Sequence, residues 1–287
     1  MADKGAMSGG DAVDAKSSTI YEGRSQKQFA DDSIEVDAVS DDLCMKYDMN
    51  YKHAGMCLIF NNKNFHPRTG MNKRNGTDED AGNLAKTFQK LRFKIMVHND
   101  QTCDEMLEKL KNAAKDDYSE MASFVCIFLS HGDDGFLFGT DGKKEIKEFT
   151  SIFRGDRCKY LVGKPKLFFI QACRGTEFDA GVETDSISED ISNPLHKIPI
   201  EADFLYAYST VAGYYSWRNT GNGSWFIQSL CHVLDTYGNK LELMRLLTRV
   251  NHKVALEFES STNVIDSSAK KQIPCIISML TKELYFS

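Results

Sequence analysis

Residues 166–175 read Lys-Leu-Phe-Phe-Ile-Gln-Ala-Cys-Arg-Gly, a run of large apolar side chains that ends in a thiol. Pro165 precedes the run and Gly175 follows the thiol, a pattern typical of a strand buried on both faces of a parallel sheet. In open α/β sheets, ligands and chemistry lie just beyond the carboxyl ends of the strands. The segment therefore predicts an α/β fold with Cys173 at its reactive edge.

Other apolar runs and helical patterns extend this prediction along the chain. The predicted strands are residues 57–60, 93–97, 124–129, 167–170, 204–208 and 272–280. The predicted helices follow Thr77 and Thr102 and cover residues 226–237 and 243–258, with Thr77 as a predicted N-cap. Strands that alternate with helices predict a six-stranded, mostly parallel sheet flanked by helices on both faces. Pro274 cannot donate a ladder hydrogen bond, so the last strand is predicted at an edge that a partner covers.

Two segments are polar instead. Residues 1–42 carry ten Asp or Glu against four Lys or Arg, and this difference equals the chain's net charge of −6. They contain no Leu, Trp or Cys, so the segment is predicted to be disordered. Residues 176–197 hold six acidic residues and are predicted to form a long functional loop. The remainder is balanced in charge and has no long apolar run, which favours neither a nucleic-acid partner nor a membrane.

The eight cysteines contain no Cys-x-x-Cys pair, so the sequence predicts no metal site, no redox motif and no cofactor. We expect free thiols and a cytoplasmic protein, because a reducing compartment keeps thiols unpaired. Most of the cysteines are expected to be buried and structural. Cys173 differs because it follows a strand end and is flanked by Ala172 and Arg174, where a nearby base or cation would make it a nucleophile.

A base for Cys173 is expected at the end of another strand. His131 directly follows the run 124–129 and Ser130, and of the seven histidines only this one ends a buried-type strand. Gly132 beside it allows a ligand to approach the backbone closely. If the two strands are neighbours, the imidazole and the thiol share one cleft.

The pentapeptide Gln171-Ala-Cys-Arg-Gly175 matches the local signature of caspases, whose histidine lies about 50 residues upstream; His131 lies 42 residues upstream. Residues 43–287 resemble the executioner type of this family in further segments: Asn61-Asn-Lys-Asn-Phe65, Phe153-Arg-Gly-Asp-Arg157, Gly163-Lys-Pro-Lys166, Glu201-Ala-Asp-Phe-Leu-Tyr-Ala-Tyr-Ser-Thr210 and Met279-Leu-Thr-Lys-Glu-Leu-Tyr-Phe286. The resemblance implies a cysteine endopeptidase of apoptosis that cuts after aspartate. It implies that Cys173 attacks the peptide carbonyl, that His131 protonates the leaving amine, and that the N–H groups of Gly132 and Cys173 hold the oxyanion.

The resemblance also implies a set of substrate-binding residues. They are Arg74, Ser130, Gln171 and Arg218 in the primary pocket, Tyr215 and Trp217 in the apolar second subsite, and Asn219 and Trp225 in the fourth. Arginine suits the primary pocket because its planar fork binds a carboxylate through two hydrogen bonds. Residues 260–268 lack the aromatic residues that executioners usually place beside the distal subsites, so the extended specificity stays open.

Activation by cleavage is a further implication of the resemblance. Val182-Glu-Thr-Asp185, followed by Ser186, has the form of a cleavage site, and Ile34-Glu-Val-Asp37 before Ala38 is a second candidate. The predicted pieces are an acidic pro-segment (residues 1–37), a large subunit with His131 and Cys173 (residues 38–185), and a small subunit with Arg218 (residues 186–287). The two subunits together form one catalytic domain. The implied partners are protein substrates with Asp at the cleaved bond, a second copy of the chain, upstream initiator caspases and inhibitor-of-apoptosis proteins.

Three alternative interpretations make different demands on the sequence. A catalytically silent relative that acts by dimerisation would not need the complete set of His131, Cys173 and the two pocket arginines. A nucleotide-binding domain would need a glycine-rich loop after the first strand, where residues 61–65 read Asn-Asn-Lys-Asn-Phe. Metacaspases and legumains could share the fold, but two arginines favour an acidic substrate side chain over a basic one.

Overall fold

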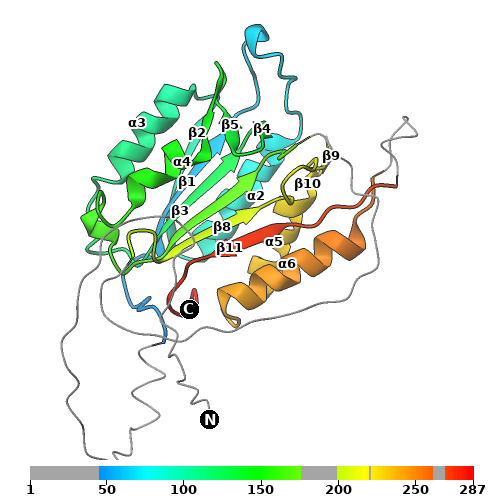
Figure 1. Ribbon diagram of the computed structural model, residues 1–287. Coiled ribbons are helices and arrows are strands. Elements are labelled where there is room, and N and C mark those ends of the chain that lie inside the picture. The colour runs from blue at the N-terminus through cyan, green and yellow to red at the C-terminus, as the bar shows by residue number, and fades with distance from the viewer. Residues whose placement is uncertain (1–44, 176–198, 220, 261–268) are drawn as a thin grey trace, which may run out of the picture. The chain divides into compact units, whose positions relative to one another are not determined.

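The computed structural model of the chain describes residues 45–175, 199–219, 221–260 and 269–287, all within one compact unit, residues 38–287. The described part is built on a six-stranded sheet (Figure 1). Its strands, in spatial order, are β11 (Cys275–Ser278), β8 (Phe204–Tyr208), β7 (Lys166–Gln171), β3 (Phe124–Leu129), β1 (Gly55–Asn61) and β2 (Phe93–Asn99). All neighbours are parallel except β11, which pairs antiparallel with β8. The predicted fold class and all six predicted strands are confirmed.

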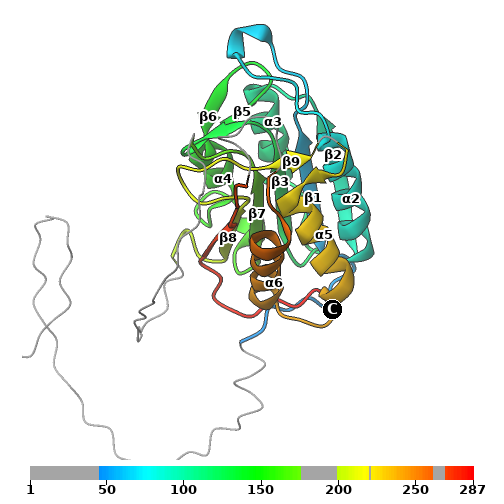
Figure 2. The same cartoon turned by 90° about the vertical axis from the view of Figure 1, so that its right-hand side faces the viewer.

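Helices cover both faces of the sheet (Figures 1 and 2). One face carries α2 (Thr77–Lys90), α5 (Trp225–Tyr237) and α6 (Leu243–Glu257), and the other carries α3 (Cys103–Ala113) and α4 (Ile146–Thr150). Successive side chains of a strand point to opposite faces. In β3, Val125, Ile127 and Leu129 pack toward the first group of helices, and Phe124, Cys126 and Phe128 toward the second. Because both faces are covered, the central strands are continuous apolar runs.

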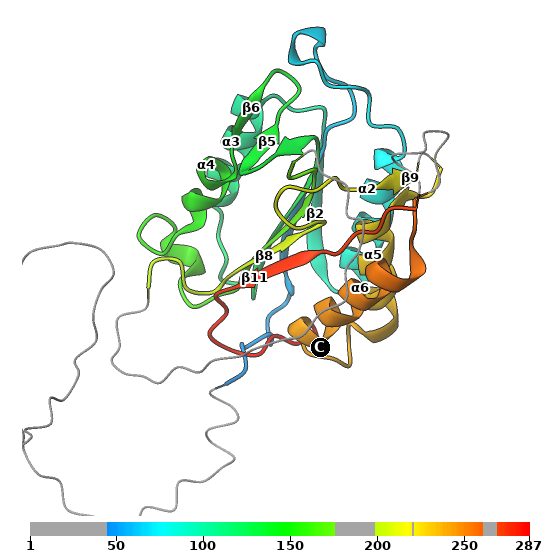
Figure 3. The same cartoon turned by 45° about the vertical axis from the view of Figure 1, so that its right-hand side comes forward.

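Short elements surround the ends of the main strands. A three-stranded sheet consists of β4 (Gly132–Asp133), β5 (Phe136–Phe138) and β6 (Lys143–Glu145), and a two-stranded one of β9 (Arg218–Asn219) and β10 (Gly223–Ser224). Figure 3 shows β9 close to α2 and α5. Three 3₁₀ helices complete the described part: η1 (Pro67–Thr69), η2 (Ser151–Phe153) and η3 (Lys159–Leu161). The sequence analysis missed these elements and α4, because a few residues carry no periodicity.

Of the two helices predicted to begin near Thr77 and Thr102, only the second begins with a threonine cap. Thr102 precedes α3 and caps it in a reciprocal box with Glu105. The prediction of Thr77 as an N-cap is wrong: Thr77 is the first residue of α2, and Gly76 is the N-cap, with a left-handed φ of 85°. The Thr77 hydroxyl instead donates to Asn61 Oδ1 at 2.8 Å and accepts from Arg74 Nη1 at 2.7 Å. It therefore orients a predicted pocket residue rather than the helix end.

Strand β11 lies at one edge of the sheet, as the sequence predicts. It begins directly after Pro274, so the proline stands outside the hydrogen-bonded ladder. Ile277 on this strand is 43% exposed. None of the helices in the described ranges is long and apolar enough to cross a membrane.

Several predictions fall outside the described residues. They concern the disordered segment 1–42, the loop 176–197 and the two candidate cleavage sites Asp37 and Asp185. Of the segment 260–268, only Ser260 is described.

Candidate active site

The thiol and the imidazole stand at one edge of the sheet because their strands are parallel neighbours. Leu129 at the end of β3 is in register with Gln171 at the end of β7, and His131 and Cys173 each follow two residues later. Gly132 touches the other strand end: a Cβ atom there would lie 2.7 Å from both Ala172 Cβ and the carbonyl oxygen of Cys173. Only glycine leaves room for this approach, which brings the two predicted catalytic segments into contact.

A cleft of about 360 Å³ opens at this edge, and both His131 and Cys173 line it. Its other lining residues are Arg74, Ser130, Gln171, Ala172, Tyr215, Ser216, Trp217 and Arg218. The structure thus brings together the predicted primary pocket and second subsite. Asn219 and Trp225, predicted for the fourth subsite, do not line the cleft.

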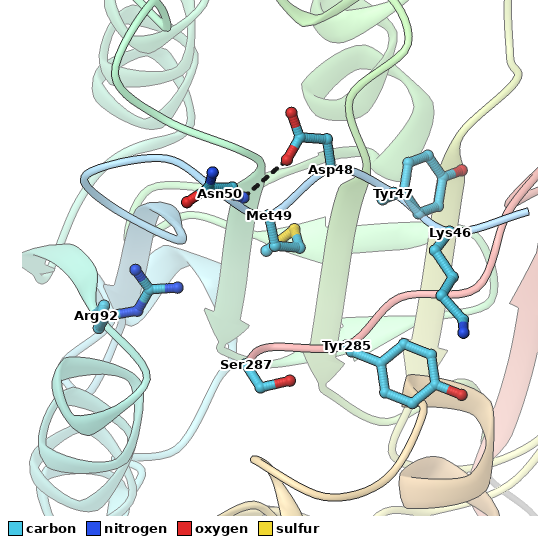
Figure 4. Close-up of a pocket in the computed structure, with 8 residues that line it drawn as sticks. All are labelled: Lys46, Tyr47, Asp48, Met49, Asn50, Arg92, Tyr285 and Ser287. Carbon is cyan, nitrogen blue, oxygen red and sulfur yellow. Dashed lines mark hydrogen bonds between the residues drawn. The ribbon is translucent and has the colours of Figure 1, made fainter. Parts of the chain in front are cut away.

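A larger cavity, of about 570 Å³, lies at the opposite ends of the strands (Figure 4). It is lined by Lys46, Tyr47, Asp48, Met49, Asn50, Arg92, Tyr285 and Ser287. Arg92 immediately precedes β2, which places this cavity away from the carboxyl edge of the sheet. Its lining contains neither a thiol nor an imidazole, so size does not mark the reactive site in this fold.

His131 is held by a backbone group that the sequence could not reveal. Its Nε2 lies 2.7 Å from the carbonyl oxygen of Asn72, and its ring packs against Phe65 with centroids 4.8 Å apart. A carbonyl oxygen only accepts, so Nε2 carries the proton and the neutral ring keeps its lone pair on Nδ1. Burial lowers the pKa of His131 to about 4, and the positive charges of Arg74 and Arg218 act in the same direction. His131 is therefore neutral at pH 7.

Arg74 is almost fully buried, with 1% of its surface exposed. Its Nη1 donates to the Asn62 carbonyl oxygen at 3.1 Å and to Thr77 Oγ1 at 2.7 Å. Its Nε and Nη2 are buried without a hydrogen-bond partner among the described residues. Burial lowers the pKa of Arg74 to about 9, and the neighbouring Arg218 adds to this effect. A buried guanidinium with free donors is costly unless an anion pairs with it.

The other predicted residues of the primary pocket line the same cleft as Arg74. Arg218 is half-buried, and its Nε donates to the Asn75 carbonyl oxygen at 2.8 Å. Gln171 Nε2 donates to Ser216 Oγ at 2.7 Å, and its Oε1 is buried without a partner in the described part. The Ser130 hydroxyl donates to the Phe138 carbonyl oxygen at 2.6 Å. Two guanidiniums from distant parts of the chain thus converge beside the thiol, which is the chemistry of a carboxylate pocket.

An aromatic wall borders the cleft. The rings of Trp217 and Trp225 stack with centroids 5.7 Å apart, and the ring of Phe258 also stacks on Trp225, with centroids 5.4 Å apart. The helical spacing predicts Phe258 on the last helix, but α6 ends at Glu257 because Phe258 has extended backbone angles. Phe258 is therefore an aromatic neighbour of the predicted subsites that sequence reasoning missed.

Two polar residues complete this region. Gln272, which the sequence analysis did not single out, accepts from the Trp217 N–H at 2.7 Å. The side-chain oxygen of Asn219 accepts from the N–H groups of Gly221 and Asn222, at 2.8 and 3.0 Å. Asn219 therefore shapes the turn between β9 and β10, and the structure shows no direct role for its amide in the cleft.

Comparison with known proteins agrees with this geometry. The caspase domain family matches residues 54–285. The chain is 59% identical to caspase-7 of Gallus gallus over 246 residues, which cover 84% of this chain and 80% of that protein. It is 61% identical to caspase-3 of Mesocricetus auratus over 240 residues, covering 84% and 86%. It is 54% identical to caspase-3 of Mus musculus over 277 residues, covering 96% and 97%.

The chain therefore belongs to the caspase family, and its relatives place it with the executioner type. It is an aspartate-specific cysteine endopeptidase of apoptosis. The comparisons favour neither a nucleotide-binding domain nor a more distant His-Gly/Cys lineage.

Proposed function

We propose that this chain cuts proteins after aspartate with Cys173 as nucleophile, His131 as proton carrier, and Arg74 and Arg218 as the carboxylate pocket. The observation that carries this assignment is the convergence of the thiol, the imidazole and both guanidiniums in one cleft. Turnover of a short peptide ending in Asp by the processed protein, beside the same peptide ending in Asn, tests it. A processed protein that cuts both peptides equally, or neither, contradicts it.

The proposed reaction proceeds in two stages. His131 Nδ1 accepts the proton of the Cys173 thiol, and the thiolate attacks the carbonyl carbon after the aspartate. The oxyanion that forms is held by the N–H groups of Gly132 and Cys173. The imidazolium then protonates the leaving amine, and a thioester links the substrate to Cys173. In the second stage water, deprotonated by His131, hydrolyses the thioester and restores the thiol.

The substrate carboxylate itself assists this proton transfer. Burial lowers the pKa of His131, and the positive charges of Arg74 and Arg218 lower it further. A bound carboxylate compensates their charge, so the pKa of His131 rises toward the working pH, where a general acid is most effective. Side chains without a charge leave the two guanidiniums uncompensated, which explains a strict preference for aspartate. Gln171 and Ser130 complete the pocket wall.

The outer subsites follow from the aromatic wall. We assign Tyr215 and Trp217 to the second subsite, since both line the cleft and Tyr215 is 37% exposed. Trp225 is only 8% exposed, and its ring stacks on that of Trp217. For the fourth subsite we retain Asn219 and Trp225 and add Phe258, the aromatic side chain that stacks on Trp225.

Activation by cleavage at Asp185 is part of the proposal. The chain would be made as a nearly inactive zymogen, with residues 38–185 as the large subunit and 186–287 as the small one. Arg74, His131 and Cys173 precede the cut and Arg218 follows it, so the cut divides the site residues between two chains. Neither Val182-Glu-Thr-Asp185 nor Ile34-Glu-Val-Asp37 begins with Asp, which favours an upstream initiator caspase with an aliphatic preference.

An Asp185→Ala chain is expected to remain a zymogen after treatment with an initiator-type caspase. Wild type treated in the same way should gain activity greatly, while removal of residues 1–37 by an Asp37 cut should change activity little. Activity on an Asp-ending peptide and the intact mass of the protein are measured together. Full activation of Asp185→Ala with residues 176–197 still uncut would contradict the proposal.

Dimerisation through β11 is expected for the processed protein. This strand is an edge of the sheet, and Ile277 on it is 43% exposed, so an antiparallel copy would extend the sheet across a two-fold axis. Sedimentation at micromolar concentration should show a dimer of large and small subunit pairs. Replacement of Ile277 by Arg should shift it toward the monomer, because two charges would meet at the axis. A wild-type protein that sediments only as a monomer excludes this assembly.

The remaining assignments concern the setting of the enzyme. We propose a cytoplasmic protein that acts on folded and disordered protein substrates with an accessible Asp. Inhibitor-of-apoptosis proteins are proposed as partners because they would compete for the same cleft. These assignments rest on the family and not on a particular contact.

A further inference from the structure

One buried carboxylate lies next to the aspartate pocket without lining it. Asp80 is in the first turn of α2 and is 1% exposed. Its two oxygens bind the same residue: Oδ1 accepts from the Ser224 N–H at 2.9 Å, and Oδ2 accepts from the Ser224 hydroxyl at 2.7 Å. A carboxylate buried on this scale is stable only when its oxygens are hydrogen-bonded.

The backbone beside Ser224 is shaped to receive this carboxylate. Gly223 has a φ of 88°, in the left-handed region that favours glycine. A Cβ atom at Gly223 would lie 2.2 Å from Asp80 Oδ1, closer than any real contact allows. The left-handed backbone at Gly223 and the missing side chain there both leave room for the Asp80 carboxylate. The β9–β10 hairpin therefore packs directly against α2.

The hairpin carries one of the two pocket arginines. Ser224 on β10 is paired with Arg218 on β9, so the hydrogen bonds of Asp80 hold the residue directly opposite Arg218. Arg218 in turn donates to the Asn75 carbonyl oxygen, next to Arg74 in sequence. These two connections join the segment that carries Arg74, which precedes the proposed cut at Asp185, to the segment that carries Arg218, which follows it.

Charge favours the same arrangement. Arg74 and Arg218 repel each other, and the negative charge of Asp80 stabilises the cationic form of both. Burial raises the pKa of Asp80 to about 6, whereas its bonds to Ser224 and the two arginines act to lower it. Burial raises the pKa of the Cys231 thiol on α5, and the negative charge of Asp80 acts in the same direction.

We propose that Asp80 is a positioning residue of the aspartate pocket: it holds the β9–β10 hairpin against α2 and so sets Arg218 opposite Arg74. The inference rests on the proposed function, because it assigns Asp80 a part in binding the substrate aspartate. It assigns no contact between Asp80 and the substrate. Loss of the connection should therefore weaken substrate binding more than it slows the chemical step.

Two substitutions separate the connection from the charge. Asp80→Ala removes both hydrogen bonds to Ser224. Asp80→Asn removes the charge but keeps the shape, since its side-chain oxygen can accept from the Ser224 N–H while its NH₂ donates to the Ser224 hydroxyl oxygen. Glu79→Ala is the matched control, because Glu79 is an exposed carboxylate on the same helical turn, where it accepts from Asn83.

The experiment compares KM and kcat of the processed variants on a peptide ending in Asp. Asp80→Ala should raise KM about tenfold or more, with a smaller change in kcat, because two hydrogen bonds to a charged group are lost. The KM of Asp80→Asn should stay within about threefold of the wild-type value, because asparagine can still make both hydrogen bonds to Ser224. Glu79→Ala should match wild type. The rate at which iodoacetamide alkylates Cys173, followed by peptide mass mapping, should be unchanged in all of them.

Three results would overturn the inference. Asp80→Ala could keep the wild-type KM, Asp80→Asn could lose as much as Asp80→Ala, or the loss could lie in kcat together with slower alkylation of Cys173. If Asp80→Ala does not fold, Ser224→Ala provides the test, because it removes one of the two hydrogen bonds to Asp80. This variant should raise KM by a smaller factor. An unchanged KM contradicts the inference. A wild-type chain that does not cut the peptide refutes the proposed function itself, which is a different outcome.

Discussion

Replacement of Cys173 by alanine is expected to reduce kcat/KM on an Asp-ending peptide by about four orders of magnitude or more. The thiol is the only protein group in the proposed reaction that forms a covalent bond to the substrate, and removal of such a nucleophile leaves only the residual contributions of binding and the oxyanion hole. The variant is measured as processed protein, beside wild type treated in the same way. Its fold should be unaffected, because Cys173 is half-buried and lies outside the two apolar clusters.

Cys103→Ala provides the matched control for this variant. Cys103 is a buried thiol that donates to the Gly142 carbonyl oxygen at 3.3 Å and does not line the cleft. It should retain activity within a few-fold of wild type. A Cys173→Ala protein that still cuts within about tenfold of wild type would show that another group is the nucleophile.

The second large effect is expected at the pocket arginines. Arg74→Ala and Arg218→Ala should each lower kcat/KM on an Asp-ending peptide by about 100-fold or more, because each removes charge-assisted hydrogen bonds to the carboxylate worth roughly 1.5–3 kcal/mol apiece. In the same variants, the ratio of kcat/KM for the Asp-ending peptide to kcat/KM for the Asn-ending peptide should be smaller than in wild type. Kinetics on the paired peptides separate loss of recognition from general loss of activity.

Arg92→Ala is the control for these variants. Arg92 lines the larger cavity at the opposite ends of the strands (Figure 4). Its Nη1 donates to the Tyr51 carbonyl oxygen. It should cut both peptides as wild type does. If Arg74→Ala or Arg218→Ala also matches wild type, that arginine is a structural charge and the pocket assignment fails.

The sequence predicted those parts of the molecule that depend on continuous apolar runs. All six strands of the main sheet were predicted, because strands covered on both faces must be apolar throughout. The order of the strands was not predicted, yet it decides the site: β3 and β7 are neighbours, and only this places His131 next to Cys173. Register and adjacency come from packing, which leaves no local pattern in the sequence.

The groups that sequence reasoning missed act through the backbone or through distant packing. The carbonyl oxygen of Asn72 fixes the tautomer of His131, and any residue at that position could supply a carbonyl. Asp80 and Ser224 are 144 residues apart in sequence, so their contact has no local signal. Phe258 was assigned to a helix because its spacing fits the helical repeat, but the chain is extended there and the ring stacks on Trp225.

The central claim is that one cleft combines a reactive thiol with a pocket for a substrate aspartate. It is tested most directly by treating processed protein with a peptide chloromethyl ketone that ends in Asp, beside the same reagent ending in Asn, and mapping the adduct by mass spectrometry. The account predicts rapid alkylation of Cys173 by the Asp reagent, slow reaction with the Asn reagent, and loss of this difference in Arg74→Ala. An adduct on another cysteine, or equal rates for both reagents, would contradict it.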